Sequence, residues 1–228
     1  MRVVRCLAFI DISGFTAFTE TEGDERAVAM LTALRSQVRD ICSRRAVRIA
    51  KWLGDGAMLV AVETTPVMAT LLELEFASSR VPDLPRIRCG VSVGEVILHE
   101  GDDYIGHAVN LAARLCDLAP GGQVLATDQA ADALPAWGAV VATEEVMLRG
   151  LEKPLTVSRV GLRPLSGVVH PDPVCGIPLT LTVAATTDRD TLGHELWFCS
   201  ESCHDTFVRR PAPPLDEPGS LRSPLIGS

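Results

Sequence analysis

Residues 3–12, VVRCLAFIDI, form an apolar run that includes Asp11 near its end and is followed at once by Ser13 and Gly14. A continuous apolar run bounded by a polar turn is typical of a strand that is buried in a sheet. We therefore expect a strand over residues 3–12, with Asp11 close to its carboxyl end. A glycine beside such a strand end lets a ligand or another backbone segment approach closely.

The segments that follow alternate between strand and helix patterns. Residues 47–53 and 57–62 are two β-rich runs separated by Gly54-Asp55-Gly56, a sequence that predicts a hairpin. Elsewhere the periodicity predicts helices at about 22–42, 66–78, 107–118 and 128–134, and strands at 87–99, 124–126, 138–148 and 155–160. This mixture predicts an α+β sandwich in which helices cover an antiparallel-rich sheet.

The composition is typical of a soluble globular protein and excludes wholesale disorder, with 228 residues of which 47% are hydrophobic and 22% charged. The formal net charge is −8 and no run is rich in Lys or Arg, so we expect no nucleic-acid partner. Glu63 and Glu73 interrupt the most apolar stretch, residues 57–76, so we expect no membrane span. The amino-terminal segment lacks the cleavage site of a signal peptide, which predicts a cytoplasmic protein.

Asp11 and Asp55 have similar surroundings, because each stands at a strand end or a tight turn beside glycine. Two carboxylates brought together form a site for a hard cation. Mg²⁺ typically combines a few carboxylates with phosphate oxygens, which points to a nucleoside triphosphate as the remaining ligand. The alternative is that Asp11 caps a turn and that Asp55 serves only the hairpin.

Several polar residues accompany this pair. Residues 13–16 lead into a helix whose first N–H groups can bind phosphate. Lys51 is one of two lysines in a chain with 21 Lys and Arg residues together, and it lies four positions before Asp55. Asn110 and Arg114 are spaced i and i+4, so they share one face of the predicted helix, where ordinary surface polarity is the alternative reading.

Five motifs occur in the order found in one known family: FIDISGFTAFTE (9–20), KWLGDGAMLV (51–60), IRCGVSVGEV (87–96), DYIGHAVNLAARL (103–115) and LRGLEKPLTVSRV (148–160). Together they resemble the class III nucleotidyl cyclase catalytic domain over about residues 3–160. The resemblance implies a ferredoxin-like cyclase sandwich. It also implies an adenylate cyclase that converts ATP into 3′,5′-cyclic AMP and pyrophosphate.

The resemblance assigns roles to the residues that match its motifs. Asp11 and Asp55, with the carbonyl of Ile12, hold two Mg²⁺ or Mn²⁺ ions. Asn110 orients the ribose, and Arg114 stabilises charge on the α-phosphate during transfer.

The implied substrate-binding residues fall into two groups. Lys51 and Asp103 match the pair that reads the purine, and these residue types imply adenine. The phosphates are assigned to Gly14, Phe15, Thr16, Arg88 and Arg149, of which Arg149 stands where the family more usually has Lys.

In this family the metal aspartates and the purine and ribose residues of one site come from opposite chains. A chain that carries both sets is therefore expected to form a homodimer with two equivalent sites. The segment between Glu95 and Tyr104 is short, which indicates a reduced dimerisation arm and leaves the strength of the dimer open.

The composition changes after residue 162. We expect a cyclase domain at residues 1–162, a linker at 163–169, a small module at 170–211 and a disordered Pro-, Ser- and Gly-rich tail at 212–228. The module contains Cys175, Cys199 and Cys203, and the last two are spaced i and i+4, so their sulfur atoms point the same way on a helix. Candidates for a fourth ligand are a water molecule, His170, His194 and His204.

HPDPVCGIPLT and ELWFCSESCHDTFVRRP resemble the YHS or TRASH-like metal-binding module. The match departs at Ile177, where Met is more usual, and at Leu196, where an aromatic residue is. The resemblance implies Zn²⁺ or another soft metal. That the module regulates the cyclase is a hypothesis that rests only on the presence of both modules in one chain. The alternatives are a mini-core of buried thiols with the aromatic side chains of the module, or a disulfide, which a reducing cytoplasm disfavours. The alternative function is a catalytically silent cyclase-like domain that binds a nucleotide or a partner, with the Cys module as a metal sensor.

Overall fold

The computed structural model describes residues 1–81, 84–99, 103–148 and 152–209. The strands of the main sheet are β1 (Arg2–Ile12), β2 (Arg48–Leu53), β3 (Gly56–Ala61), β4 (Ile87–His99), β5 (Asp103–Ile105), β6 (Val124–Thr127), β7 (Gly138–Val146) and β8 (Leu155–Leu162). The helices are α1 (Phe15–Glu22), α2 (Asp24–Arg44), α3 (Thr64–Ser79), α4 (His107–Leu118), α5 (Asp128–Ala131) and α6 (Glu201–Val208).

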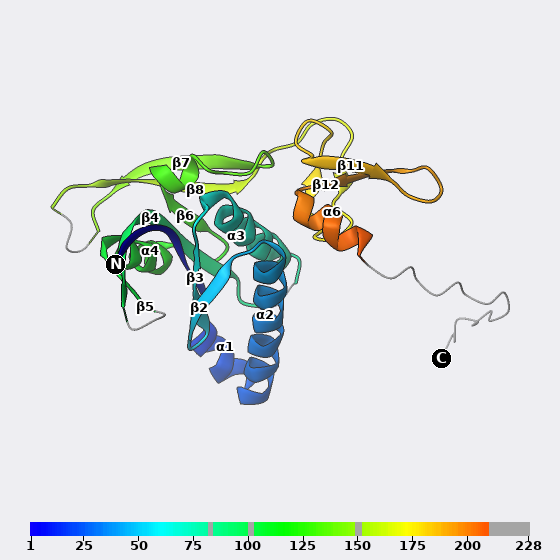
Figure 1. The fold of residues 1–228 in the computed structure, drawn as a ribbon. Helices are drawn as coiled ribbons and strands as arrows, with labels where there is room; N and C mark the ends of the chain where they lie inside the picture. The colour runs from blue at the N-terminus through cyan, green and yellow to red at the C-terminus, as the bar shows by residue number, and fades with distance from the viewer. Residues whose placement is uncertain (82–83, 100–102, 149–151, 210–228) are drawn as a thin grey trace, which may run out of the picture.

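The main sheet has the strand order β2-β3-β1-β4-β6-β8-β7, with β5 paired to the end of β4. β1 lies inside this sheet and pairs antiparallel with β3 and β4, whereas β4 and β6 are parallel. Helices cover the sheet, as Figure 1 shows. The predicted α+β sandwich with an antiparallel-rich sheet is therefore confirmed.

Alternation along β1 separates the two faces of the sheet. Cys6, Ala8 and Ile10 belong to the large core that includes buried residues of α2 and α3. Leu7 and Phe9 belong to a smaller core with Ala108 and Ala112 of α4. Asp11 follows in the same alternation as Leu7 and Phe9, so it lies on the α4 face of the sheet.

Two predicted helices differ from the structure. The helix expected at 22–42 is preceded by a separate helix, α1, because Gly23 has φ of +85° and interrupts the helical path between α1 and α2. The helix expected at 128–134 ends at Ala131 as α5, and the backbone tightens into i→i+3 hydrogen bonds at Ala133 and Leu134 ahead of Pro135.

The C-terminal segment forms two short hairpins and a helix. The strands are β9 (His170–Pro171) with β10 (Pro178–Leu179), and β11 (Thr186–Arg189) with β12 (Glu195–Phe198). Buried residues of this segment, including Ile177 and Phe198, belong to the same core as α2 and α3. Figure 1 shows β12 and α6 beside α3. The predicted tail at 212–228 lies outside the described residues.

Candidate functional site

Asp11 is held by an arginine from the neighbouring strand. Asp11 and Arg88 face each other in the register of β1 and β4. Arg88 donates to Asp11 Oδ2 from Nη2 at 2.6 Å and from Nε at 2.9 Å, and its Nη1 donates to the carbonyl of Asp117 at 3.0 Å. Burial, the largest single effect, acts to lower the pKa of Arg88, but the hydrogen bond to Asp11 and the nearby negative charges together raise it. Two of the predicted site residues are therefore in direct contact.

The turn between β2 and β3 places Asp55 close to Asp11 at the end of β1. A Cβ atom on Gly56 would lie 2.4 Å from the carbonyl oxygen of Ile10 and 3.3 Å from Asp11 Oδ1, so only glycine lets the hairpin approach β1 this closely. Burial raises the pKa of Asp55, and the charge of Asp11 raises it further. Asp11 and Asp55 are therefore close enough to interact electrostatically.

A helix residue that sequence reasoning missed supports this turn. Arg35 of α2 donates from Nη2 to the carbonyl oxygen of Gly54 at 2.8 Å, and its guanidinium lies over the ring of Trp52. Gly54 itself has φ of +62°, a conformation that glycine adopts without strain. No motif of the sequence identified Arg35, because its position on an amphipathic helix resembles that of a solvated surface charge.

The donor set of this region fits a hard divalent cation. The carboxylate of Asp11 on β1 and that of Asp55 in the turn between β2 and β3 interact, and Ile12 with its backbone carbonyl follows Asp11 directly at the end of β1. A positive ion placed between the carboxylates would offset the repulsion that raises the pKa of Asp55. The assignment of Asp11, Asp55 and Ile12 to two cations stays a prediction.

Lys51 and Asp103 form an ion pair although they lie 52 positions apart. Lys51 Nζ lies 2.6 Å from Asp103 Oδ1, which also accepts from the backbone N–H of Tyr104 at 2.9 Å. The bond from Lys51 holds the pKa of Asp103 below its usual value. Arg48 lies over the ring of Tyr104, so β5 packs against β2 at this point. The two residues assigned to the purine are therefore adjacent.

Helix α4 presents Asn110 and Arg114 from a rigid base. A Cβ atom on Gly90 would lie 2.1 Å from the backbone nitrogen of Cys116, so α4 rests directly on β4. Asn110 is exposed and Arg114 is half-buried. Among the residues that the structure describes, neither side chain has a hydrogen-bonding or ion-pair partner. Both are therefore available to a ligand or to another chain.

The amino end of α1 carries the predicted phosphate-binding residues. Gly14 precedes the helix with φ of +77°, and no side chain caps the helix there. Phe15 and Thr16 are its first two residues, so their backbone N–H groups stand at the positive end of the helix dipole. Arg149, the remaining predicted phosphate ligand, lies outside the described residues.

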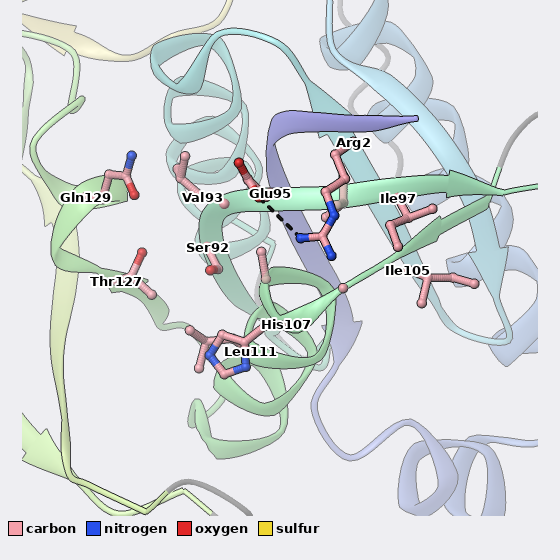
Figure 2. A pocket seen from close by; sticks show the side chains of 14 residues that line it. Arg2, Ser92, Val93, Glu95, Ile97, Ile105, His107, Leu111, Thr127 and Gln129 are labelled. Carbon is pink, nitrogen blue, oxygen red and sulfur yellow. Dashed lines mark hydrogen bonds and ion pairs between the residues drawn. The ribbon is translucent and has the colours of Figure 1, made fainter.

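A cavity of about 480 Å³ lies elsewhere, where β4 and β5 meet the start of α4. Figure 2 shows its polar lining, in which Arg2 pairs with Glu95 at 3.5 Å and Ser92 and Thr127 contribute hydroxyl groups. None of the candidate residues described above lines it. This cavity is therefore separate from the candidate site.

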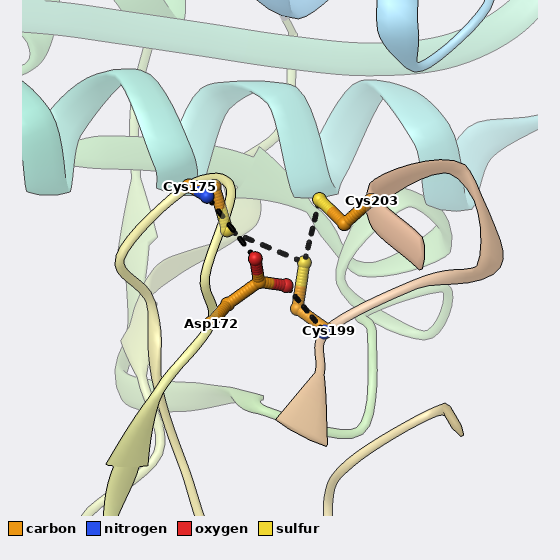
Figure 3. A group of neighbouring side chains, drawn as sticks. All are labelled: Asp172, Cys175, Cys199 and Cys203. Carbon is orange, nitrogen blue, oxygen red and sulfur yellow. Dashed lines mark hydrogen bonds between the residues drawn. The ribbon is translucent and has the colours of Figure 1, made fainter. Parts of the chain in front are cut away.

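The three cysteines of the C-terminal segment meet, as Figure 3 shows. Cys199 Sγ lies 3.5 Å from Cys175 Sγ and 3.5 Å from Cys203 Sγ. Thiolates around a tetrahedral zinc ion, with Zn–S of about 2.3 Å, stand about 3.8 Å apart. The spacing therefore fits one soft cation. We call these three residues the Cys cluster.

Asp172 is a residue of this cluster region that the sequence analysis did not identify. Its Oδ1 accepts from the backbone N–H groups of Val174 and Cys175, at 2.7 and 3.1 Å, and its Oδ2 accepts from that of Cys199 at 2.7 Å. The carboxylate thus joins the two loops that carry the cysteines. It also lies with the three sulfur atoms in one group whose potential ligand atoms are within 4.8 Å of one another. The only sequence signal was its position three residues before Cys175.

The three histidines considered as a fourth ligand are engaged elsewhere. His204 Nε2 lies 3.1 Å from Asp188, and His194 Nδ1 lies 2.8 Å from Asp190. The ring of His170 packs on Trp197 with centroids 4.4 Å apart. Among the described residues, the group that could hold a metal here contains Asp172 and no histidine. Of the candidates for the fourth ligand, the three histidines are therefore not supported by the structure.

Comparison with known proteins agrees with this geometry. Residues 4–158 match the family model described as the adenylate and guanylate cyclase catalytic domain. The chain belongs to this family. Cyclase catalytic domains bind a nucleotide substrate, use Mg²⁺ or Mn²⁺ and act as dimers. None of the described helices is long and apolar enough to span a bilayer.

Individual relatives of the cyclase domain include enzymes of both specificities. The chain is 33% identical over 150 residues to the uncharacterized protein Rv2212 of Mycobacterium tuberculosis, covering 65% of this chain and 39% of that one. It is 33% identical over 128 residues to the pH-sensitive adenylate cyclase MT1302 of the same species, covering 56% and 32%. The chain thus spans about two fifths or less of these curated relatives. The guanylyl cyclase Cya2 has the same fold, with a TM-score of 0.64, 21% identity and coverage of 72% and 94%.

Proposed function

We propose that the protein is an adenylate cyclase that converts ATP into 3′,5′-cyclic AMP and pyrophosphate. The observation that carries this proposal is the contact between Lys51 and Asp103, 2.6 Å apart. Lysine only donates hydrogen bonds and a carboxylate only accepts them. A lysine next to a carboxylate complements the acceptor N1 and the donor N6 amine of adenine. Guanine also presents an acceptor, O6, beside a donor, N1–H, so the choice of adenine rests in addition on the family resemblance, which assigns these residue types to adenine.

The cation site would be formed by Asp11, Asp55 and the carbonyl of Ile12. Two bound Mg²⁺ or Mn²⁺ ions would lower the pKa of the ribose 3′-hydroxyl and neutralise charge on the phosphates. Arg88 neutralises Asp11 in the cation-free protein. Its side chain is then free to bind the terminal phosphates once a cation takes over that role. The N–H groups that follow Gly14 bind phosphate from the other side.

Asn110 and Arg114 act on the sugar and on the reacting phosphate. Asn110 orients the ribose. Arg114 donates to charge that develops on the α-phosphate, and removing such a preorganised donor typically costs about 10²–10³-fold in kcat. Their lack of partners in their own chain, among the described residues, supports a site completed by a second copy. The active form is then a homodimer in which a two-fold axis creates two equal sites.

The C-terminal segment has a proposed role of its own. The Cys cluster binds Zn²⁺ or another soft cation, supported by the sulfur spacing of 3.5 Å. The division into a cyclase domain at 1–162, a linker at 163–169 and a YHS-like module at 170–211 remains part of this proposal, as do cytoplasmic location and regulation by the metal.

The decisive experiment measures cyclic nucleotide formation by the purified full chain with Mn²⁺, using ATP and GTP in parallel. We expect cyclic AMP from ATP and at least tenfold slower turnover of GTP. Asp103→Ala should lower kcat/KM for ATP tenfold or more. Faster turnover of GTP would refute the adenylate assignment. Absence of both products would favour the catalytically silent domain, with Arg114→Ala as the inactive reference.

A further inference from the structure

Two buried charged residues, Glu73 and Arg45, and the partly buried Arg44 lie where the C-terminal segment meets the cyclase domain. Glu73 of α3 is 3% exposed, and Arg45, which directly follows α2, is 6% exposed. Arg45 Nε donates to Glu73 Oε2 at 2.7 Å. Arg44, the last residue of α2, donates to both carboxylate oxygens. Two arginines thus share one carboxylate, and this leaves one positive charge of the trio uncompensated in a buried place.

The guanidinium groups of Arg44 and Arg45, which carry this excess positive charge, contact two sulfur atoms of the Cys cluster. Arg45 Nη2 lies 3.2 Å from Cys199 Sγ, and Arg44 Nη1 lies 3.1 Å from Cys203 Sγ. Arginine is a donor only, so each contact is an N–H bond to sulfur. The same junction includes a bond of 3.1 Å from Trp137 Nε1 to the carbonyl of Cys199. The cysteines are therefore held by groups from the cyclase domain as well as by their own loops.

We propose that Arg44 and Arg45 are part of the metal site, where they donate hydrogen bonds to the cysteine sulfur atoms and neutralise their charge. The inference rests on the metal binding proposed above for the Cys cluster. A divalent cation on three thiolates leaves one negative charge, and the two arginines with Glu73 supply one positive charge. The cation, the three thiolates, the two arginines and Glu73 therefore sum to zero charge only when the C-terminal segment is docked on α2 and α3. The further carboxylate of the group, Asp172, is compensated instead by three backbone N–H groups.

This arrangement makes cation binding and docking one linked equilibrium. Groups that contact metal ligands typically change metal affinity by about 10–100-fold when they are removed. Linkage then requires that a bound cation stabilise the docked segment by the same factor with which docking tightens the cation. Arg35 lies on the same helix, α2, and holds the Asp55 turn through Gly54. The helix therefore connects the metal site with the substrate-side aspartates.

The test measures Zn²⁺ affinity of the reduced full chain by competition with a chromophoric chelator. Arg45→Gln and Arg44→Gln should each weaken Zn²⁺ binding about tenfold or more. Arg26→Gln is the matched control, because Arg26 lies on α2 with an exposed side chain paired to Glu22. It should leave the affinity within about twofold. If a single arginine variant does not fold, the double variant Arg45→Gln/Glu73→Gln is measured in its place. It removes one positive and one negative charge, so no buried carboxylate is left without its partner.

Three results would overturn the inference. Arginine variants that bind Zn²⁺ as tightly as the wild type, while Cys203→Ser does not bind it, would restrict the site to the cysteines. A wild type that binds no Zn²⁺ would remove the site altogether, without bearing on ATP turnover. Thermal unfolding of the wild type gives a second readout: Zn²⁺ should raise the transition of the cyclase core, and a shift confined to a separate C-terminal transition would contradict the linkage.

Discussion

The guanidinium of Arg88 lies 2.6 Å from Asp11 Oδ2, across the pair of strands β1 and β4. A positive side chain therefore already compensates the carboxylate that is proposed to bind a cation. A divalent ion at Asp11 has to compete with this ion pair, whereas the phosphates of a bound nucleotide offer Arg88 a second partner. Binding of the metal at Asp11 and binding of the nucleotide phosphates by Arg88 should therefore favour each other.

Arg88→Gln is expected to have opposite effects on two ligands. Without nucleotide, the variant should bind Mn²⁺ several-fold more tightly, because Asp11 loses its competing cation. With nucleotide, KM for ATP should rise about tenfold, since a charged bond to phosphate is lost. Paramagnetic resonance of free Mn²⁺ and steady-state kinetics measure the two effects. Arg86→Gln, which breaks a pair with Glu75, serves as the control. Weaker Mn²⁺ binding by the Arg88 variant would exclude the competition.

Gly56→Ala tests whether close approach of the hairpin positions Asp55. The new Cβ atom would lie 2.4 Å from the backbone oxygen of Ile10, so the hairpin has to move away from Asp11. We expect at least tenfold lower kcat and a loss of about 1–3 kcal/mol in the free energy of unfolding. Gly54→Asn is the matched control, because its added side chain meets open space and asparagine tolerates φ of +62°. Equal activities of the two variants would argue against this positioning.

Several of these relationships could be predicted from the sequence and others could not. Local sequence patterns predicted β1 and the helix at 107–118, and the Gly-Asp-Gly turn predicted the hairpin. Contacts between distant segments carry no local signal, so the sequence predicted roles for Lys51 and Asp103 only through family resemblance. Glu73 illustrates the limit, because it interrupts an apolar stretch as a solvated residue would.

The partners of Glu73 explain why it is buried instead. Arg44 and Arg45 come from another helix and supply the bonds that make burial of its carboxylate tolerable. On α2 these arginines follow the pattern of an exposed helix end, where basic residues are common. Only the packing of α2 on α3, and of the C-terminal segment against both, reveals that they face a carboxylate and two sulfur atoms. Pairwise burial of this kind is a property of the tertiary structure.

Asp55→Asn should stabilise the cation-free protein while it abolishes turnover. Burial and the charge of Asp11 raise the pKa of Asp55 in the folded state, so its ionised form destabilises the fold above that pKa. The destabilisation fades as pH falls through the folded pKa and is absent below the unfolded one. Because the side chain is largely solvated, we expect a gain under about 1 kcal/mol.

The measurement for Asp55 is the difference in Tm between variant and wild type, taken without divalent ions at pH 7 and at about pH 4, the usual pKa of an aspartate. The difference should favour the variant at pH 7 and narrow toward pH 4. Asp132→Asn, an exposed carboxylate at the end of α5, should show no such change. A variant that is less stable than the wild type at pH 7 would contradict the repulsion between Asp11 and Asp55.

Mixing two inactive variants tests whether each site combines residues of two chains. Asp11→Ala removes the cation half of both sites in a homodimer, and Arg114→Ala removes the other half. A heterodimer of the two restores one intact site and leaves one site doubly defective. Random exchange of equal amounts makes half of the dimers mixed, so activity should return to about a quarter of the wild-type value.

Asp11→Ala mixed with Asp55→Ala is the matched control and should stay inactive, because both substitutions remove the cation half of the site. Recovery in the first mixture alone requires that Asp11 of one copy and Arg114 of the other act on the same triphosphate. A first mixture as inactive as its parents would show that each chain forms its site alone or forms none.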